Sequence, residues 1–193
     1  VLSIITSSRD DLVDLKRSYK KGRVLKESLK VALCGLPNSG KSSLLNCLTG
    51  YDRAIVTEIE GTTRDTLEVR IDINGIPVTL IDTAGIRKTS DMVEQIGVER
   101  AMKATSECDL VLYLIDPDTS LNVAEKMLSD ILANGVEARN VISIFSKADK
   151  KENEERLAIE EFLEEKQVRK SIEISCVTRI NINELCDAIE AFY

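Results

Sequence analysis

The residues whose chemistry is most evident in this sequence run from Gly35 to Ser42, in the order Gly-Leu-Pro-Asn-Ser-Gly-Lys-Ser. This spacing matches GxxxxGK[ST], in which backbone N–H groups curl around phosphate groups and a helix N-terminus adds partial positive charge. Lys41 would reach the β- and γ-phosphates, and the hydroxyl of Ser42 would bind Mg²⁺. The stretch therefore predicts a phosphate-binding loop formed by Asn38, Ser39, Gly40, Lys41, Ser42 and Ser43.

Two further short patterns follow this loop in the order that nucleotide hydrolysis requires. The first, Gly61-Thr62-Thr63-Arg64-Asp65, offers a threonine hydroxyl that could complete a Mg²⁺ shell. The second, Asp82-Thr83-Ala84-Gly85, places a carboxylate at the end of a predicted strand, where it could hold the Mg²⁺ shell through water, and Gly85 could donate its N–H to a γ-phosphate. Each pattern alone is typical of an ordinary loop or turn. Behind a phosphate-binding loop, both favour a nucleotide site.

The residues that could read a base come later in the chain, after two more predicted strands. In Ser146-Lys147-Ala148-Asp149, the Asp149 carboxylate could accept both N1–H and the 2-amino group of guanine, a pattern that adenine does not offer. The aliphatic stem of Lys147 could cover the base. The last predicted strand ends in Ser175-Cys176-Val177, where the Cys176 N–H could meet guanine O6. A core cysteine at a strand end is the alternative interpretation of Cys176.

The elements that must position these residues alternate between strand and helix from residue 30 onward. Asn74-Gly75 between two runs of β type indicates a hairpin. The pattern predicts a mainly parallel six-stranded sheet with one antiparallel edge strand and helices on both faces, an α/β fold. The expected strands are 30–34, 66–73, 76–82, 110–116, 141–146 and 171–175, and the expected helices are 41–50, 92–107, 122–134, 152–166 and 182–193.

Composition excludes several other classes of protein. The 193 residues are 43% hydrophobic and 31% charged, which is typical of a globular chain with a real core. The sequence has no histidine, so a catalytic triad or a zinc site that depends on histidine is excluded. Five scattered cysteines without a CxxC pair favour a reduced, cytoplasmic setting. The longest apolar run, 110–115, is far shorter than the roughly 20 residues of a membrane span.

Charge separates the first 29 residues from the rest. Residues 1–30 carry eight Lys/Arg against four Asp/Glu, whereas 31–193 carry 18 against 29, out of a net charge of −7. Such an acidic body is a poor general binder of nucleic acid. A broken apolar stripe in 1–29 predicts a helix with no partner inside the domain. We therefore expect 1–29 to be a helical arm of a neighbouring domain and 30–193 to form the nucleotide-binding domain.

With these patterns in order, the chain resembles a translation-factor-type GTPase, and more narrowly the G domain of the MnmE (TrmE) family of tRNA-modification GTPases. The resemblance runs from about Leu25 to Tyr193. It rests on ESLKVALCGLPNSGKSSLLNCLTG, DRAIVTEIEGTTRDTLEV and LIDTAGIRKTSDMVEQIGVERAM. The Era and Der GTPases share GTTRD and DTAG, but RAIVT and IGVERA look more like MnmE. In that family the G domain, which has the P-loop GTPase fold, is inserted into a helical domain, so 1–29 looks like the chain leading into the insertion.

The resemblance also implies a mechanism. GTPases of this family are stimulated by K⁺ and activated by dimerisation of their G domains. By analogy, Asn38 would bind K⁺ together with oxygens of Thr57, Ile59 and Thr62, and Thr63 would join Ser42 on Mg²⁺. Ras-type GTPases orient the attacking water with a glutamine just after DTAG, where this chain has Ile86. In the MnmE family a glutamate further along does so through water, and the matching residue is Glu94, which with Lys41 would be catalytic.

One residue departs from the family pattern, because Ser146 stands where the usual NKxD motif has asparagine. A shorter hydroxyl would perform only part of the asparagine's task of binding the base and tying the loop to the phosphate-binding loop.

The expected ligands are GTP and GDP. The resemblance implies that the full-length family protein has tRNA and an MnmG (GidA) type flavoprotein as partners and no membrane. Two alternatives remain: a guanine-nucleotide switch with negligible hydrolysis in isolation, and an Era/Der-like ribosome-assembly GTPase.

Overall fold

The structure is a computed structural model of the chain and describes residues 28–50, 67–82, 105, 107–150 and 152–193. All of the expected arm except Ser28 and Leu29, and nearly all of the expected helix 92–107, lie outside the described residues. The descriptions that follow apply to the described parts only.

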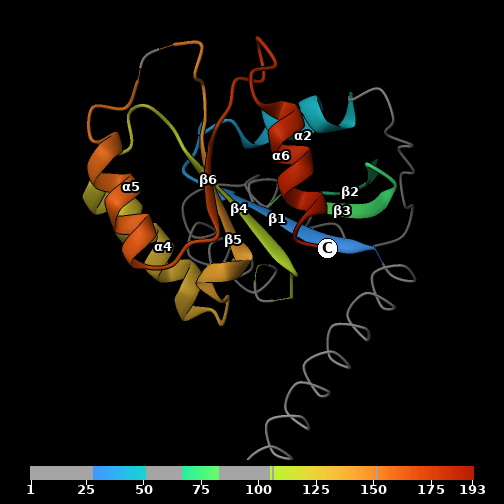
Figure 1. Cartoon of the computed structure of the whole chain (residues 1–193), viewed down its shortest axis with the longest axis horizontal. Coiled ribbons are helices and arrows are strands. Elements are labelled where there is room, and N and C mark those ends of the chain that lie inside the picture. Colours follow the sequence, from blue (N-terminus) through green and yellow to red (C-terminus); the bar gives the residue numbers. More distant parts are fainter. Residues whose placement is uncertain (1–27, 51–66, 83–104, 106, 151) are drawn as a thin grey trace, which may run out of the picture.

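Six strands form a single mixed sheet in the order β2-β3-β1-β4-β5-β6 (Figure 1). Five of them run parallel, and β2 pairs antiparallel with β3 at one edge. This arrangement confirms the sheet expected from the sequence. The strands are β1 (Leu29–Gly35), β2 (Leu67–Ile73), β3 (Ile76–Asp82), β4 (Leu110–Ile115), β5 (Val141–Phe145) and β6 (Lys170–Glu173).

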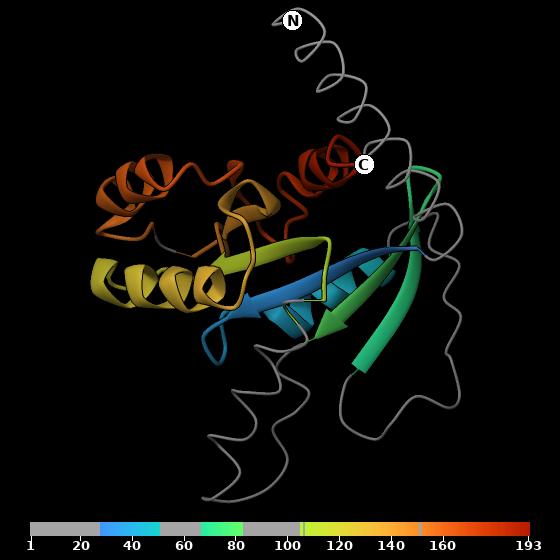
Figure 2. The same cartoon turned by 90° about the horizontal axis from the view of Figure 1, so that it is seen from below.

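Helices cover both faces of the sheet, as Figures 1 and 2 show. The helices α2 (Lys41–Thr49) and α6 (Ile182–Glu190) pack on one face, and α4 (Leu121–Ala133) and α5 (Arg156–Glu165) pack on the other. Strand β4 serves both layers, because alternate side chains of a strand point to opposite faces. A strand covered on both sides must be apolar throughout, which explains the uninterrupted run of buried residues in β4.

The β2–β3 hairpin turns over two residues. Asn74 and Gly75 have φ angles of 52° and 85°, and the flanking residues Ile73 and Ile76 pair with each other. Positive φ at both central positions is the geometry for which Asn-Gly is selected, because the twist of such a turn matches that of the strands. The hairpin predicted from Asn-Gly is confirmed. The Asn74 side chain also donates to Asp187 and Glu190 of α6.

Several element ends differ from the expected ones. Strand β1 begins at Leu29, which is buried and pairs with Val78, and α6 ends at Glu190 in a turn rather than continuing to residue 193. The largest difference is in α5, which was expected from residue 152 but begins at Arg156. The preceding Asn153 is buried, and its side chain bonds to the chain after β4. This long-range contact holds residues 152–155 out of the helix.

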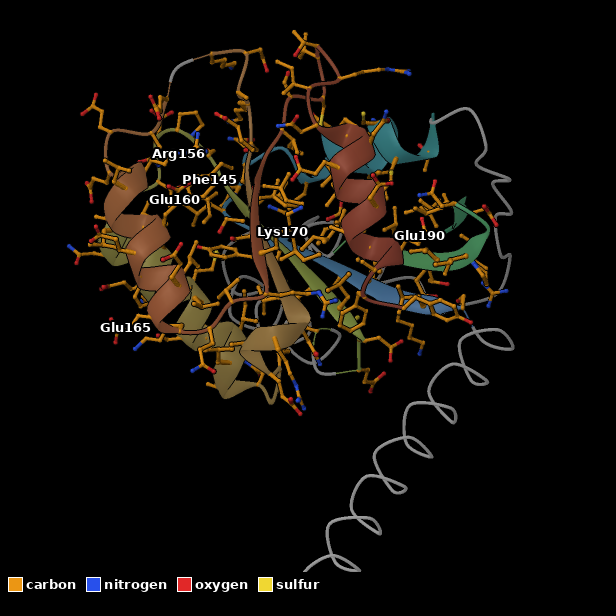
Figure 3. All side chains as sticks on the ribbon, in the orientation of Figure 1. Phe145, Arg156, Glu160, Glu165, Lys170 and Glu190 are labelled. Atoms are coloured by element: carbon orange, nitrogen blue, oxygen red, sulfur yellow. The ribbon has the colours of Figure 1, made fainter. Side chains whose placement is uncertain are left out.

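Arg156 fastens the start of α5 to the sheet. Its guanidinium lies 4.9 Å from the centre of the Phe145 ring and donates to Glu160 at 3.0 Å, and Figure 3 shows these three side chains together. It also pairs with Glu173 of β6 at 2.8 Å. Arg156 thereby links α5, β5 and β6.

Among the described residues, no helix has the length and apolar character needed to span a membrane.

The core geometry predicts which leucines carry stability. Leu112 of β4 is fully buried, whereas Leu157 of α5 is 77% exposed. Leu112→Ala should lower the free energy of unfolding by about 2–5 kcal/mol, because it removes buried methyl groups and leaves a cavity. Leu157→Ala is the matched control and should change it by less than about 0.5 kcal/mol. Urea unfolding followed by circular dichroism measures both. Equal effects of the two substitutions would contradict this placement of the core.

Candidate functional site

The candidate residues meet where the parallel strands β1, β3, β4 and β5 have their carboxyl ends. We call this the carboxyl edge of the sheet, as distinct from its outer strands. Pairing aligns Leu33 of β1 with Asp82, Gly35 with Leu114, and Ile115 with Phe145. The residues that follow these strands therefore emerge side by side. In open α/β sheets this edge is where ligands bind. The described parts of all three expected groups, the phosphate-binding loop, Asp82 and the segment 146–149, lie along it.

The phosphate-binding loop joins β1 to α2 and depends on its glycines for two different reasons. A Cβ on Gly35 would lie 2.6 Å from Ser39 Oγ and 2.7 Å from the Leu114 carbonyl oxygen, so a side chain has no room there. A Cβ on Gly40 would make only ordinary contacts, none closer than 3.8 Å, but the φ of 99° at this position strains any other residue. Asn38 has a φ of 63°, a left-handed conformation that asparagine adopts more readily than most residues. The loop conformation alone thus accounts for an asparagine at position 38.

Lys41, the first residue of α2, is buried with its ammonium inside the loop. Its Nζ donates to the carbonyl oxygens of Gly35 at 2.8 Å and Leu36 at 2.5 Å, and lies 3.4 Å from Ser39 Oγ. The side chain therefore holds its charge in the concave side of the loop, beside the N-terminus of α2. Both features attract phosphate oxygens. The predicted phosphate-binding role of Lys41 fits this geometry.

The residues present fit a hard divalent cation that is bound mainly by a phosphate. Ser42 is exposed in the first turn of α2, and Asp82 is buried at the end of β3. Both supply oxygen ligands, the type that Mg²⁺ prefers, and Mg²⁺ usually keeps few protein ligands beside phosphate oxygens and waters. The described residues contain no cluster of three His, Cys, Asp or Glu that could hold a metal by itself. This donor set suits Mg²⁺ in company with a nucleotide.

The expected base-reading carboxylate is held in place by a buried serine. Ser175 Oγ donates to Asp149 Oδ1 at 2.5 Å and accepts a bond from the Thr178 N–H at 3.1 Å. The hydrogen bond from Ser175 is the main cause that lowers the pKa of Asp149 below its ordinary value. Asp149 is exposed and ionised at neutral pH, so its carboxylate is available as an acceptor.

Cys176 and Val177 follow Ser175 on the same loop but face different surroundings. The side chain of Cys176 packs against the core, and burial raises the pKa of its thiol to about 12, so the thiol stays neutral. Val177 is 81% exposed. The packed thiol agrees with the interpretation of Cys176 as a core residue and leaves its backbone N–H as the group that could meet a base.

Ser146 performs one of the two tasks of the asparagine that it replaces. Its hydroxyl donates to the Ser39 carbonyl oxygen at 2.7 Å and lies 3.3 Å from that of Ile115. Ser146 therefore ties the segment after β5 to the phosphate-binding loop across 107 positions of sequence. A hydroxyl has a single hydrogen, which this contact uses.

Two residues at this edge were not expected from the sequence. Asp116 follows β4 directly and lies with Oδ2 3.3 Å from Lys147 Nζ, and Asn153 donates to the Asp116 carbonyl oxygen at 3.0 Å. Both are buried. An acidic residue directly after a fully apolar run is a visible signal for Asp116, although the strand predicted from the sequence, 110–116, includes it. Nothing local in the sequence marks Asn153.

The remaining predicted site residues lie outside the described residues, and their roles stay predictions. They are Thr57, Ile59, Thr62, Thr63, Thr83, Ala84, Gly85 and Glu94, together with Ile86.

Comparison with known proteins identifies the family. Residues 30–147 match the family model described as 50S ribosome-binding GTPase. The tRNA modification GTPase MnmE of Neisseria gonorrhoeae is 49% identical over 136 residues, which are 70% of this chain and 30% of that protein. The protein of the same name from Acinetobacter baylyi is 38% identical over 191 residues, which are 99% of this chain and 40% of that protein. The chain thus spans well under half the length of these curated relatives.

A solved structure shows the same architecture. The crystal structure of Era in complex with MgGDPNP and nucleotides 1506–1542 of 16S ribosomal RNA has a TM-score of 0.63 and 27% identity, and covers 84% of this chain and 56% of that chain. The six-stranded sheet described above is therefore the sheet of P-loop GTPases.

The link from Ser146 to the phosphate-binding loop yields a prediction. Ser146→Ala should lower the free energy of unfolding by about 1 kcal/mol, because the buried hydrogen bond from the Ser146 hydroxyl to the Ser39 carbonyl oxygen is lost. Ser129→Ala on α4 is the matched control, since the Ser129 hydroxyl bonds within its own helix at an exposed position. Its effect should stay within about 0.5 kcal/mol. Denaturant unfolding compares the two, and a Ser146→Ala protein as stable as the control would show that the link is not made.

Proposed function

We propose that this chain, which belongs to the family of 50S ribosome-binding GTPases, is the GTP-binding and GTP-hydrolysing domain of a tRNA-modification GTPase of the MnmE type. Family membership makes the chain a GTPase domain that converts GTP and water to GDP and phosphate. The observation that carries the proposal is the hydrogen bond that connects the expected phosphate-binding and base-binding parts of the site. Ser146 connects the phosphate-binding loop to the segment of Asp149, so phosphate and base are recognised together.

Lys41 and the loop amides perform the binding of the phosphate groups. The Lys41 ammonium exchanges its carbonyl partners for oxygens of the β- and γ-phosphates. The N–H groups at the start of α2 point toward the same oxygens, and the helix adds its partial positive charge. Charge that develops on the phosphate oxygens during hydrolysis is thereby stabilised by groups already in position.

Mg²⁺ and K⁺ are the cofactors of this proposal. Ser42 and Thr63 would hold Mg²⁺, with Asp82 bound to its shell through water, and Asn38 would hold K⁺ with Thr57, Ile59 and Thr62. Both ions supply positive charge beside the transferred phosphoryl group, K⁺ in the place of an arginine finger. The oxygen donors of Ser42 and Asp82 support the Mg²⁺ part.

Glu94 is the proposed positioning group for the attacking water, acting through another water. Two facts of composition support it: the chain has no histidine, and Ile86, in the place of the usual glutamine, has no polar group. A carboxylate further along the chain after DTAG, at the start of the predicted helix 92–107, could then orient the water.

The longer protein that such a domain belongs to would act in the cytoplasm on tRNA. Its partners would be a second copy, through transient contact of the G domains, and an MnmG (GidA) type flavoprotein. Support for tRNA comes from the relatives, which are named tRNA modification GTPases and are two to three times longer than this chain. The dimer and the flavoprotein rest on the family resemblance alone.

Asp149 should decide base selectivity. Asp149→Asn replaces an acceptor by an amide that can also donate, so affinity should move from GDP toward xanthosine diphosphate, with GDP weakened about 10- to 100-fold, as for loss of a charged hydrogen bond. The amide oxygen can still accept from Ser175, so the loop should keep its shape. Calorimetric titration with both nucleotides measures the change. Asp130→Asn, an exposed carboxylate on α4, is the control. Unchanged preference in Asp149→Asn would reject the base-reading role.

Catalysis should depend on K⁺ and on Glu94. Single-turnover GTP hydrolysis at high protein concentration should be faster in K⁺ than in Na⁺, and ATP should not be hydrolysed. Glu94→Ala should slow the K⁺-dependent step about 10²–10⁴-fold, the range for positioned acid–base groups, with little change in binding of a non-hydrolysable GTP analogue. A normal rate in Glu94→Ala would assign the water to another group. Binding of GTP without turnover in either salt would favour the alternative of a nucleotide-dependent switch.

A further inference from the structure

Asp116 is a buried carboxylate at the site edge that the function above does not use. Its two oxygens have different partners. Oδ1 accepts the Thr119 hydroxyl at 2.9 Å and the Asp118 N–H at 3.1 Å, which close the turn after β4. Oδ2 faces Lys147 Nζ at 3.3 Å. The first pair of contacts shapes the turn, whereas the second reaches the segment that would cover the base.

The backbone of Asp116 is fixed from a second direction. Asn153 Nδ2 donates to the carbonyl oxygens of Asp116 at 3.0 Å and Thr119 at 2.8 Å, and Asn153 Oδ1 accepts the Glu155 N–H at 2.8 Å. The turn after β4 is thereby joined to the start of α5. Asp116 is thus a rigid anchor, because its main chain and one carboxylate oxygen are both held by other residues.

Lys147 is held at its other end by the sheet. Its neighbours Ser146 and Ala148 donate backbone N–H groups to the carbonyl oxygens of Ile115 at 2.8 Å and Ile174 at 3.0 Å. Lys147 itself has a φ of 61°, a conformation that a lysine adopts rarely. The Lys147 backbone is fixed by these bonds and its ammonium faces Asp116, so the methylene stem runs between two fixed points.

We propose that Asp116 is a positioning residue for guanine binding: by holding the Lys147 ammonium at 3.3 Å, it fixes the aliphatic stem as the surface on which the guanine ring packs. The inference rests on the proposed function, since it takes Lys147 to be the residue that covers the base. Asp116 touches no nucleotide and acts only through Lys147. This anchor carries added weight because Ser146, with its single hydrogen engaged, has no hydroxyl donor left for the base.

A double-mutant cycle tests the coupling of the two residues. Asp116→Asn keeps the shape of the side chain and removes its charge, and Lys147→Met keeps an aliphatic stem and removes the ammonium. Each should raise the Kd for GDP about tenfold, and Asp116→Asn should add less than about twofold in the Lys147→Met background. Lys147→Arg, which keeps both stem and charge, should restore most of the affinity. Asp130→Asn on α4 is the matched control for charge.

A second ligand separates positioning from structural damage. Inorganic pyrophosphate with Mg²⁺ occupies the phosphate half of the site without a base, so its affinity should be unchanged in every variant, as measured by competition with a fluorescent GDP. Equal weakening of GDP and pyrophosphate in Asp116→Asn, or additive effects of the two substitutions, would overturn the proposal.

Two further results separate this inference from the function on which it rests. Lys147 is partly exposed, with 26% of its side chain accessible, so its variants test the idea even if Asp116→Asn does not fold. Lys147→Met with wild-type affinity for GDP would overturn the anchor. A different result would overturn the proposed function itself: wild-type protein that binds ADP as tightly as GDP.

Discussion

The hydrogen bond from the Ser146 hydroxyl to the Ser39 carbonyl oxygen is the contact on which the whole site depends. It joins the loop after β1, proposed to bind phosphate, to the loop after β5, which carries Asp149, the proposed base-reading carboxylate. The two loops are otherwise separated by β4, which lies between β1 and β5 in the sheet. A nucleotide that spans both loops needs them at a fixed separation. One buried hydroxyl links the two loops here, where the family pattern has the longer asparagine.

The same sheet edge concentrates backbone conformations that are costly elsewhere. Asn38, Gly40 and Lys147 all have positive φ angles, of 63°, 99° and 61°. Such residues persist only where the surrounding structure determines them, and they gather at functional sites. Here the surrounding structure is the pair of buried layers on either side of the sheet. The apolar strands therefore support the site indirectly, because their packing holds the loops in conformations that an unfolded chain would rarely adopt.

Much of this arrangement could be predicted from the sequence because its signals are local. Gly35 and Gly40 mark the loop, Asn74-Gly75 marks the hairpin, and the apolar run of β4 marks a central strand. Each depends on residues within one element and its neighbours. The mainly parallel sheet with one antiparallel edge strand also followed, since strands that alternate with helices pair in parallel and the hairpin adds an antiparallel strand. The late start of α5 could not be predicted, because the contact that delays it comes from the turn after β4, more than thirty positions earlier in the chain.

The number of hydrogen-bond donors on the residue at position 146 decides which other residues must bind the base. An asparagine side chain has two donors and an acceptor, so it can tie the loops together and still bind a base, whereas Ser146 has one hydrogen and gives it to Ser39. In the proposed site, guanine would then be bound by Asp149, which accepts a hydrogen bond from Ser175, and by Lys147, which faces Asp116. Both of these partner residues, Ser175 and Asp116, are buried. If these residues bind the base as proposed, serine at position 146 leaves recognition to side chains supported by the turn after β4 and the segment after β6.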